Sequence, residues 1–218
     1  MFRNRADAAC LLAELVTTRL GDPSRPGTAA SALVLGLPRG GVPVAAVVAQ
    51  ALGAQLDVLI VRKIGVPWQP ELALGAVGEG GAVVLNEAVI AASGVRHDQV
   101  DALIREASQV VEQIVAELRP EAGPPDLGDR TVIVVDDGVA TGATARAAAK
   151  IVHSRGSGDV IFAAPVGAPS SCSDLRSCFD EVLCLQTPWS FGSVGRHYEH
   201  FEQVSIGEVR RLLGGPPA

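Results

Sequence analysis

The stretch from Thr131 to Thr144, TVIVVDDGVATGAT, constrains the fold of this chain more than any other. Its apolar run Val132–Val135 is typical of a strand that is covered on both faces. Asp136 and Asp137 follow at the carboxyl end of this expected strand, which is where open α/β sheets bind their ligands. A Gly- and Thr-rich loop then leads into an Ala-rich helix. The stretch therefore predicts a strand–loop–helix unit with a ligand site at the carboxyl edge of a sheet.

The chemistry of this stretch points to a phosphorylated sugar. The loop 138–144 presents backbone N–H groups and two hydroxyls at an expected helix N-terminus, which is an anion site. Ionised Asp136 and Asp137 accept hydrogen bonds but donate none, so they suit the hydroxyls of a vicinal diol. The alternative interpretation is a buried strand, a polar turn and a capped helix without a ligand.

Val132–Thr144 resembles the phosphoribosyl-pyrophosphate (PRPP) motif of the type I phosphoribosyltransferases: four apolar residues, two acids, and Thr-Gly-x-Thr after a short variable segment. The resemblance implies that Asp136 and Asp137 hold the ribose 2′- and 3′-hydroxyls. It also implies that the loop wraps the 5′-phosphate through Ala140, Thr141, Gly142, Ala143 and Thr144.

A second predicted anion site follows an earlier strand, 31–37, which ends in Pro38-Arg39-Gly40-Gly41 ahead of an apolar helix. Glycine lets the backbone approach an anion closely, and Arg39 adds a bidentate donor. Two such sites in one sheet indicate a ligand with phosphates at both ends. By the resemblance, this run falls at the pyrophosphate loop of type I enzymes, which often carries a strained peptide bond. A plain turn at the two glycines is the alternative.

The segment 62–82 is rich in Gly and Pro and lacks a stable period, so it predicts a flexible lid loop over a charged ligand. We assign its first residues, Arg62 and Lys63, to pyrophosphate, with solvated side chains as the alternative. The segment is similar to the matching part of adenine phosphoribosyltransferases, where Glu-Tyr-Gly closes the region. Here the run is Glu79-Gly80-Gly81, and the missing Tyr weakens a transfer of adenine specificity.

The proton-transfer group is the least defined part of the predicted site. In the 6-oxopurine enzymes a further Asp of the PRPP motif acts on the base, and this chain has Ala140 at that place. Glu79 is therefore our candidate for a carboxylate near the base. The residues that we expect to take part in catalysis are Arg39, Lys63, Glu79, Asp136 and Asp137, and Gly40 and Arg62 join them in PRPP binding.

The C-terminal segment holds four of the eight aromatic residues of a chain that is only 4% aromatic. Trp189, Phe191 and Tyr198 follow the last expected core strand, where they can stack on a planar base or form the core of a small cap. The run 191–201 resembles the C-terminal stretch of hypoxanthine-guanine phosphoribosyltransferases, in which an aromatic and backbone groups frame the purine. This resemblance assigns base binding to the three aromatic residues.

The alternation of strands and helices along the chain predicts an α/β fold with a parallel, doubly covered sheet of about five strands. We expect one domain over residues 1–218, with a core at about 30–187, the lid at 62–82 and a C-terminal cap at about 188–213. The expected core strands are 31–37, 56–61, 132–135, 160–166 and 182–185, with 83–85 as a short strand of the lid. The expected helices are 2–20, 44–52, 98–118, 145–152 and 170–178.

The composition of the chain limits the classes of molecule that it is expected to bind. A net charge of −6 counts against a nucleic-acid partner, and no apolar run reaches membrane-spanning length. The N-terminal residues are amphipathic rather than signal-like, so we expect a cytoplasmic protein. The expected partners are PRPP and a nucleobase, and a homodimer is left open.

The predicted function is transfer of ribose-5-phosphate from PRPP to a nitrogenous base, with a purine-like base favoured and release of pyrophosphate, as in nucleoside salvage. The resemblance implies Mg²⁺ as cofactor, bridging the ribose hydroxyls and pyrophosphate. Its protein contacts are expected to be mainly indirect, with Asp136 and Asp137 as the candidates for direct ones. The alternative is a non-catalytic regulatory protein that binds PRPP or a nucleotide with the same fold.

Overall fold

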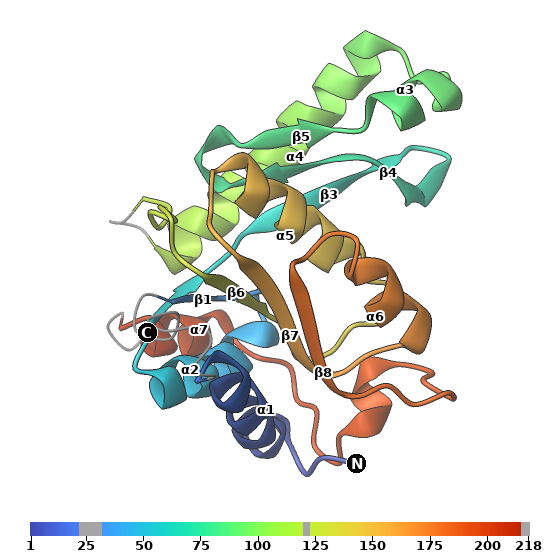
Figure 1. Ribbon diagram of the computed structural model, residues 1–218. Helices are drawn as coiled ribbons and strands as arrows, with labels where there is room; N and C mark the ends of the chain where they lie inside the picture. The colour runs from blue at the N-terminus through green and yellow to red at the C-terminus, as the bar shows by residue number, and fades with distance from the viewer. Residues whose placement is uncertain (22–31, 120–122, 215–218) are drawn as a thin grey trace.

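The computed structural model describes residues 1–21, 32–119 and 123–214, and Figure 1 shows their arrangement. Ser31, at which the first strand was predicted to begin, lies outside the described residues. No helix in the described ranges is both long and apolar enough to cross a membrane.

A five-stranded sheet forms the centre of the fold, with the strand order β2-β1-β6-β7-β8 and every pair parallel. Its strands are β1 (Leu33–Gly36), β2 (Gln55–Val58), β6 (Val132–Val135), β7 (Val160–Val166) and β8 (Glu181–Gln186). The chain runs outward from β1 to β2 and then returns to place β6 on the other side of β1. The gap between β1 and β6 is therefore the topological switch point, where sheets of this kind bind ligands.

Helices cover both faces of this sheet, as the sequence predicted (Figure 1). One face packs against α1 (Arg5–Leu20) and α2 (Gly41–Leu52), with inward residues such as Ile133 and Ile161. The other face packs against α5 (Ala143–Ser154) and α6 (Pro169–Leu175), with inward residues such as Val134 and Phe162. Neighbouring residues of one strand thus enter different cores, which explains the continuous apolar runs.

A second, antiparallel sheet replaces the loop that the sequence predicted between residues 62 and 82. It contains β3 (Val61–Val66), β4 (Gln69–Gly78) and β5 (Val83–Leu85), with the short 3-10 helix η1 (Glu79–Gly81) between the last two strands. The single strand predicted at 56–61 is correspondingly divided into β2 and the start of β3. The prediction of a segment without regular structure is therefore wrong for residues 62–66 and 69–78.

The glycines of this hairpin explain why its strands were not predicted from the sequence. A Cβ on Gly65 would lie 2.5 Å from the carbonyl oxygen of Pro70, and one on Gly75 would overlap the backbone of Val84. Each glycine is therefore required by a close backbone approach, although glycine is usually depleted in strands. The apolar residues of the hairpin are buried against α4 (His97–Leu118), the longest predicted helix, which follows the short α3 (Glu87–Ser93).

The C-terminal segment packs on the start of the chain through residues 191–202 and on α2 and α4 through its last helix. After β8 it forms the 3-10 helix η2 (Val194–His197) and the helix α7 (Ile206–Leu212). Phe2 and Tyr198 form an isolated parallel bridge, with their ring centres 5.5 Å apart. The predicted cap is thus built from both ends of the described chain.

Candidate functional site

The two predicted anion loops meet at the switch point. Gly36 at the end of β1 is in register with Val135 at the end of β6, so the loops that follow leave the sheet side by side. A Cβ on Gly41 would lie 2.5 Å from the carbonyl oxygen of Val135, and a Cβ on Gly40 would overlap the Asp137 carboxylate. The Pro38–Arg39 peptide bond between β1 and α2 is cis. Both glycines are needed because the two loops touch.

The two acids after β6 lie in different surroundings. The backbone N–H of Asp137 donates to Oδ1 of Asp136 at 2.9 Å. Burial, and secondly the neighbouring charge of Asp137, raise the pKa of the Asp136 carboxyl well above its ordinary value. Asp137 instead accepts a hydrogen bond at Oδ2 from Nε of Arg5 at 2.8 Å, within an ion pair whose side chains are 14% and 13% exposed.

Arg5 is a residue of this site that sequence reasoning missed. Its Nη1 donates to the carbonyl oxygen of Glu202 at 2.7 Å, and its guanidinium carbon lies 3.9 Å from the ring centre of Phe201. The hydroxyl of Tyr198 donates to the carbonyl oxygen of Asp137 at 2.6 Å. Both ends of the chain therefore fix Asp137. The one available signal was an arginine in the first turn of an expected helix, where the helix dipole disfavours a cation.

The loop predicted to bind a 5′-phosphate leads into α5. Gly142 is the N-cap of α5 and has a φ of 68°, a conformation that favours glycine. The hydroxyl of Ser171 donates to the carbonyl oxygen of Ala140 at 2.6 Å, and Val139 pairs with Gly167 next to it. These contacts hold the loop beneath the N-terminus of α5, where backbone N–H groups favour an anion.

One cavity of about 270 Å³ contains residues from both predicted anion loops. Arg39 and Thr144 line it, together with apolar side chains that include Leu37 and Ile60. The cavity lies at the carboxyl end of β1, below the C-terminal part of α4. The structure thus brings together one predicted pyrophosphate ligand and one predicted phosphate ligand.

The cations predicted at the start of the lid lie elsewhere. Arg62 and Lys63 are consecutive residues of β3, so their side chains point to opposite faces of the strand. Arg62 is exposed, and Lys63 lines a different cavity, next to α5. The three cations predicted to gather on pyrophosphate therefore do not share one cavity, because Arg39 lines one, Lys63 lines another and Arg62 lines neither.

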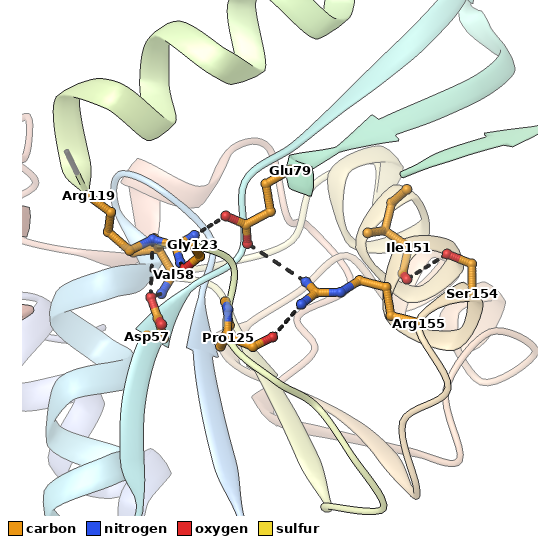
Figure 2. Close-up of polar contacts among 9 residues, drawn as sticks. All are labelled: Asp57, Val58, Glu79, Arg119, Gly123, Pro125, Ile151, Ser154 and Arg155. Carbon is orange, nitrogen blue, oxygen red and sulfur yellow. Dashed lines mark hydrogen bonds and ion pairs between the residues drawn. The ribbon is translucent and has the colours of Figure 1, made fainter. Parts of the chain in front are cut away.

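Glu79 is not placed where the sequence predicted a carboxylate near the base. Glu79 is 2% exposed, and its Oε2 forms an ion pair with Arg119 (Figure 2). Its Oε1 lies 3.9 Å from Nη1 of Arg155. Arg119 also lies 3.5 Å from Asp57. Gly78, next to Glu79, approaches Ile151 near the end of α5, whereas the phosphate loop precedes the start of this helix. Ile151 lies eight residues after Ala143, or about 12 Å along the helix, so Glu79 is remote from the loop.

The charges around Glu79 form a buried network that joins the two sheets. Burial, as the largest cause, raises the pKa of the Asp57 carboxyl and lowers the pKa of the Arg119 guanidinium. Arg119 also donates to the carbonyl oxygen of Gly123 at 2.7 Å (Figure 2). Because β2, η1 and the ends of α4 and α5 all contribute, the network fixes the base of the antiparallel sheet on the core.

The predicted base-binding aromatic residues do not form one surface. Trp189 is 97% exposed, whereas Phe191 and Tyr198 are buried in a cluster with Phe2. Phe191 also stacks on His197, with ring centres 5.1 Å apart. The core of a small cap, which was the alternative interpretation, describes Phe191 and Tyr198 in this structure. Among the described residues, no group of three or more His, Cys, Asp or Glu side chains forms a metal site.

Comparisons with known proteins agree with this geometry. Residues 28–199 match the family model of the phosphoribosyl transferase domain. The chain is 41% identical over 213 residues to the protein Rv0571c of Mycobacterium tuberculosis, whose name assigns it to the phosphoribosyl transferases. This match covers 98% of the chain and 46% of the relative, so the chain spans about half the length of the curated relatives it matches.

Solved structures give the same fold. TT1426 from Thermus thermophilus has a TM-score of 0.87 and 38% sequence identity, over 98% of this chain and 97% of that one. AQ2163 from Aquifex aeolicus has a TM-score of 0.51 and 13% identity, over 96% of this chain and 84% of that one, and so shows the fold alone. The acid pair after β6 and the loop that ends at Gly142, the N-cap of α5, lie within the matched residues. The chain belongs to the phosphoribosyl transferase domain family.

Proposed function

We propose that this protein transfers ribose-5-phosphate from PRPP to a nitrogenous base and releases pyrophosphate. The observation that carries the proposal is the meeting of the loops after β1 and β6 at the switch point, with Arg39 and Thr144 in one cavity. A two-ended sugar phosphate matches two adjacent anion loops separated by an acid pair.

In this proposal each end of PRPP has its own loop. The 5′-phosphate accepts hydrogen bonds from the backbone N–H groups at the start of α5 and from the hydroxyls of Thr141 and Thr144. Arg39 and the backbone at Gly40 bind pyrophosphate. Arg62 and Lys63 lie on β3 and reach the leaving group only if the antiparallel sheet moves relative to the core.

The acid pair orients the ribose. Asp136 and Asp137 accept hydrogen bonds from the 2′- and 3′-hydroxyls, which fixes C1 of the sugar relative to the incoming base. Arg5 keeps the Asp137 carboxylate in one orientation and opposes its charge. As the bond from C1 to pyrophosphate breaks and the bond to the base nitrogen forms, Arg39 stabilises the negative charge on the leaving group.

Mg²⁺ fits this site as a cofactor that is held mainly by the substrate. Asp136 and Asp137 are the carboxylates at the site that can hold it, and Mg²⁺ commonly uses only one or two protein carboxylates besides water and phosphate oxygens. When bound, the ion supplies positive charge to the pyrophosphate oxygens.

The acceptor is proposed to be purine-like because the run 191–201 resembles the purine-binding stretch of a related group of enzymes. Ala140 leaves no carboxylate at the place where that group holds its catalytic Asp. Phe201 is a new candidate for contact with the base because it is 36% exposed and lies against Arg5 and Tyr198. We further propose a role in nucleoside salvage in the cytoplasm.

Calorimetric titration of PRPP with Mg²⁺ tests the proposed donor site. We expect the unmodified protein to bind PRPP and the Asp137→Asn variant to bind it at least about 10-fold more weakly, since a neutral amide accepts hydrogen bonds less strongly than a carboxylate. Asp101→Asn, at an exposed residue of α4, is the matched control. Equal PRPP affinity in all three proteins contradicts the assignment of the acid pair.

A further inference from the structure

A second cavity lies between α5 and the antiparallel sheet, two elements that Figure 1 shows side by side. It measures about 280 Å³. Its walls come from β3, β4, the start of α3 and one face of α5. It is distinct from the cavity of the proposed PRPP site, which Arg39 and Thr144 line, although Lys63 and Ala143 of the predicted PRPP residues belong to its walls.

Cations gather in this second cavity. The chain has two lysines, Lys63 and Lys150, and both line it, together with Arg146. Arg146 and Lys150 are four residues apart on α5, so they project from the same face of the helix. Among the side chains that the structure describes, no carboxylate lines the cavity, and none pairs with Arg146 or Lys150.

This arrangement is unfavourable in the absence of an anion. Like charges at this helical spacing repel each other, and both side chains are half-buried. A phosphate group between them accepts charge-assisted hydrogen bonds from Arg146 and Lys150, and its charge offsets the repulsion. The charge pattern therefore points to a ligand with a phosphate.

The opposite side of the cavity is apolar. Ala73 and Ala76 of β4 and Val89 of α3 line it, with the amide of Asn86 nearby. Small-molecule sites usually have volumes of roughly 300–1,000 Å³, so this cavity lies at the lower end of that range. A ligand that fits it has one phosphate and one compact body with a planar or apolar face.

We propose that this second cavity binds a nucleoside 5′-monophosphate, with its phosphate at Arg146 and Lys150 and its base against the alanines of β4. The site is additional to the proposed PRPP site. It is also adjacent to that site, because Ala143 lines the second cavity and Thr144, the next residue, lines the first. An occupant would therefore touch the first turn of the helix whose N-terminus forms the phosphate loop.

Calorimetric titration tests the proposal. The full chain is first saturated with PRPP and Mg²⁺ and then titrated separately with AMP, GMP, UMP, CMP and inorganic phosphate. We expect at least one nucleoside monophosphate to bind one molecule per chain, and at least about 10-fold more tightly than inorganic phosphate. The Arg146→Met/Lys150→Met variant should weaken this binding at least about 10-fold and leave PRPP affinity within about 3-fold. The matched control is Arg105→Met/Arg176→Met, which removes the same charge at exposed residues.

The outcomes separate this proposal from the proposed function. If no nucleoside monophosphate binds, or if the double variant binds it as well as the control does, the cavity is not the site. If the double variant loses PRPP affinity to the same extent, the two cations serve the PRPP site and the proposal of a second site is overturned. If PRPP itself does not bind, the proposed PRPP site is wrong. The nucleoside monophosphates are then titrated without PRPP, and the affinities of the double variant and its control still show whether the second cavity is a binding site.

Discussion

Arg5 and Asp137 form an ion pair across 132 positions of sequence, with Nε of Arg5 2.8 Å from Oδ2 of Asp137. This contact joins the first turn of α1 to the loop after β6. The guanidinium also packs on Phe201, so the C-terminal segment shares the contact. The orientation of a proposed ribose-binding carboxylate thus depends on both ends of the chain.

Replacing Arg5 should weaken PRPP binding. In Arg5→Met, Asp137 loses its cation and the packing on Phe201 changes, so we expect KM for PRPP to rise by about 10- to 100-fold, corresponding to about 1.4–2.8 kcal/mol. Arg5→Lys should recover only part of the loss because Lys lacks the planar guanidinium. Steady-state kinetics checks this, with Arg3→Met as the control, since Arg3 is exposed and pairs with Asp7. A KM for Arg5→Met equal to that of the control contradicts the positioning role.

Replacing Asp136 with Asn should stabilise the protein above the ordinary pKa of a carboxyl group. Because burial raises the pKa of Asp136, the folded protein holds this proton more tightly than the unfolded chain does. The contribution of Asp136 to stability therefore falls as the pH rises from the ordinary carboxyl pKa to the raised value, and stays low above it. An asparagine side chain at this position does not titrate. The Tm of Asp136→Asn minus that of the unmodified protein should therefore increase as the pH rises over that interval.

The measurement for Asp136 is Tm by calorimetry between pH 4 and pH 8. At the upper end we expect Asp136→Asn to melt about 2–4 °C higher, the shift that roughly 1 kcal/mol produces in a chain of this size. Asp129→Asn, at an exposed residue before β6, should show no such divergence. Parallel melting curves for Asp136→Asn and the unmodified protein at every pH refute the raised pKa.

A methyl group at Gly40 should damage the proposed site without unfolding the chain. The Cβ of Gly40→Ala would overlap the Asp137 carboxylate, so the carboxylate must move away from Arg5 and from the proposed ribose position. We expect PRPP affinity to fall by at least about 10-fold. Gly123→Ala is the control because its Cβ meets no atom within 4 Å. Calorimetric titration should show full PRPP affinity in the control alone.

Glu79 should matter for stability and not for the chemical step. In Glu79→Gln the buried Arg119 loses one of its two charged partners and keeps Asp57, so we expect a loss of up to about 3–5 kcal/mol, the cost of breaking a buried pair. Urea denaturation measures this loss, and kcat at a temperature where the variant is folded should be unchanged. The Glu79→Leu/Arg119→Met variant should recover only part of the stability, because it removes both charges of the pair but also takes a cation away from Asp57. A large fall in kcat with unchanged stability would restore Glu79 as the carboxylate near the base.

The sequence predicted the parallel sheet well because its strands carry local signals. Val132–Val135 and Val160–Val166 are continuous apolar runs with the bounds that the structure has, and both faces of each are covered. Asp136 and Asp137 follow directly from the strand end, so their location needed no tertiary information. The antiparallel sheet was missed because Gly65 and Gly75 serve close backbone contacts that only the folded chain reveals.

The side-chain partners within the site were less predictable. Glu79 is adjacent in sequence to a Gly-rich turn typical of a lid, yet its partner Arg119 is 40 positions away at the end of α4. Arg5 lies far outside every motif, and its role depends on how α1 packs on the sheet. Long-range ion pairs of this kind leave no periodic trace in the sequence.

Pyrophosphate release from PRPP tests the central proposal most directly. The protein is incubated with PRPP, Mg²⁺ and each of a panel of free purine and pyrimidine bases, and pyrophosphate is measured together with the nucleotide formed. We predict release that requires a base, is greatest with a purine-like one, and is lost in Asp137→Asn but retained in Asp101→Asn. No release with any base, alongside measurable PRPP binding, would contradict the transferase and favour a PRPP-binding regulatory protein.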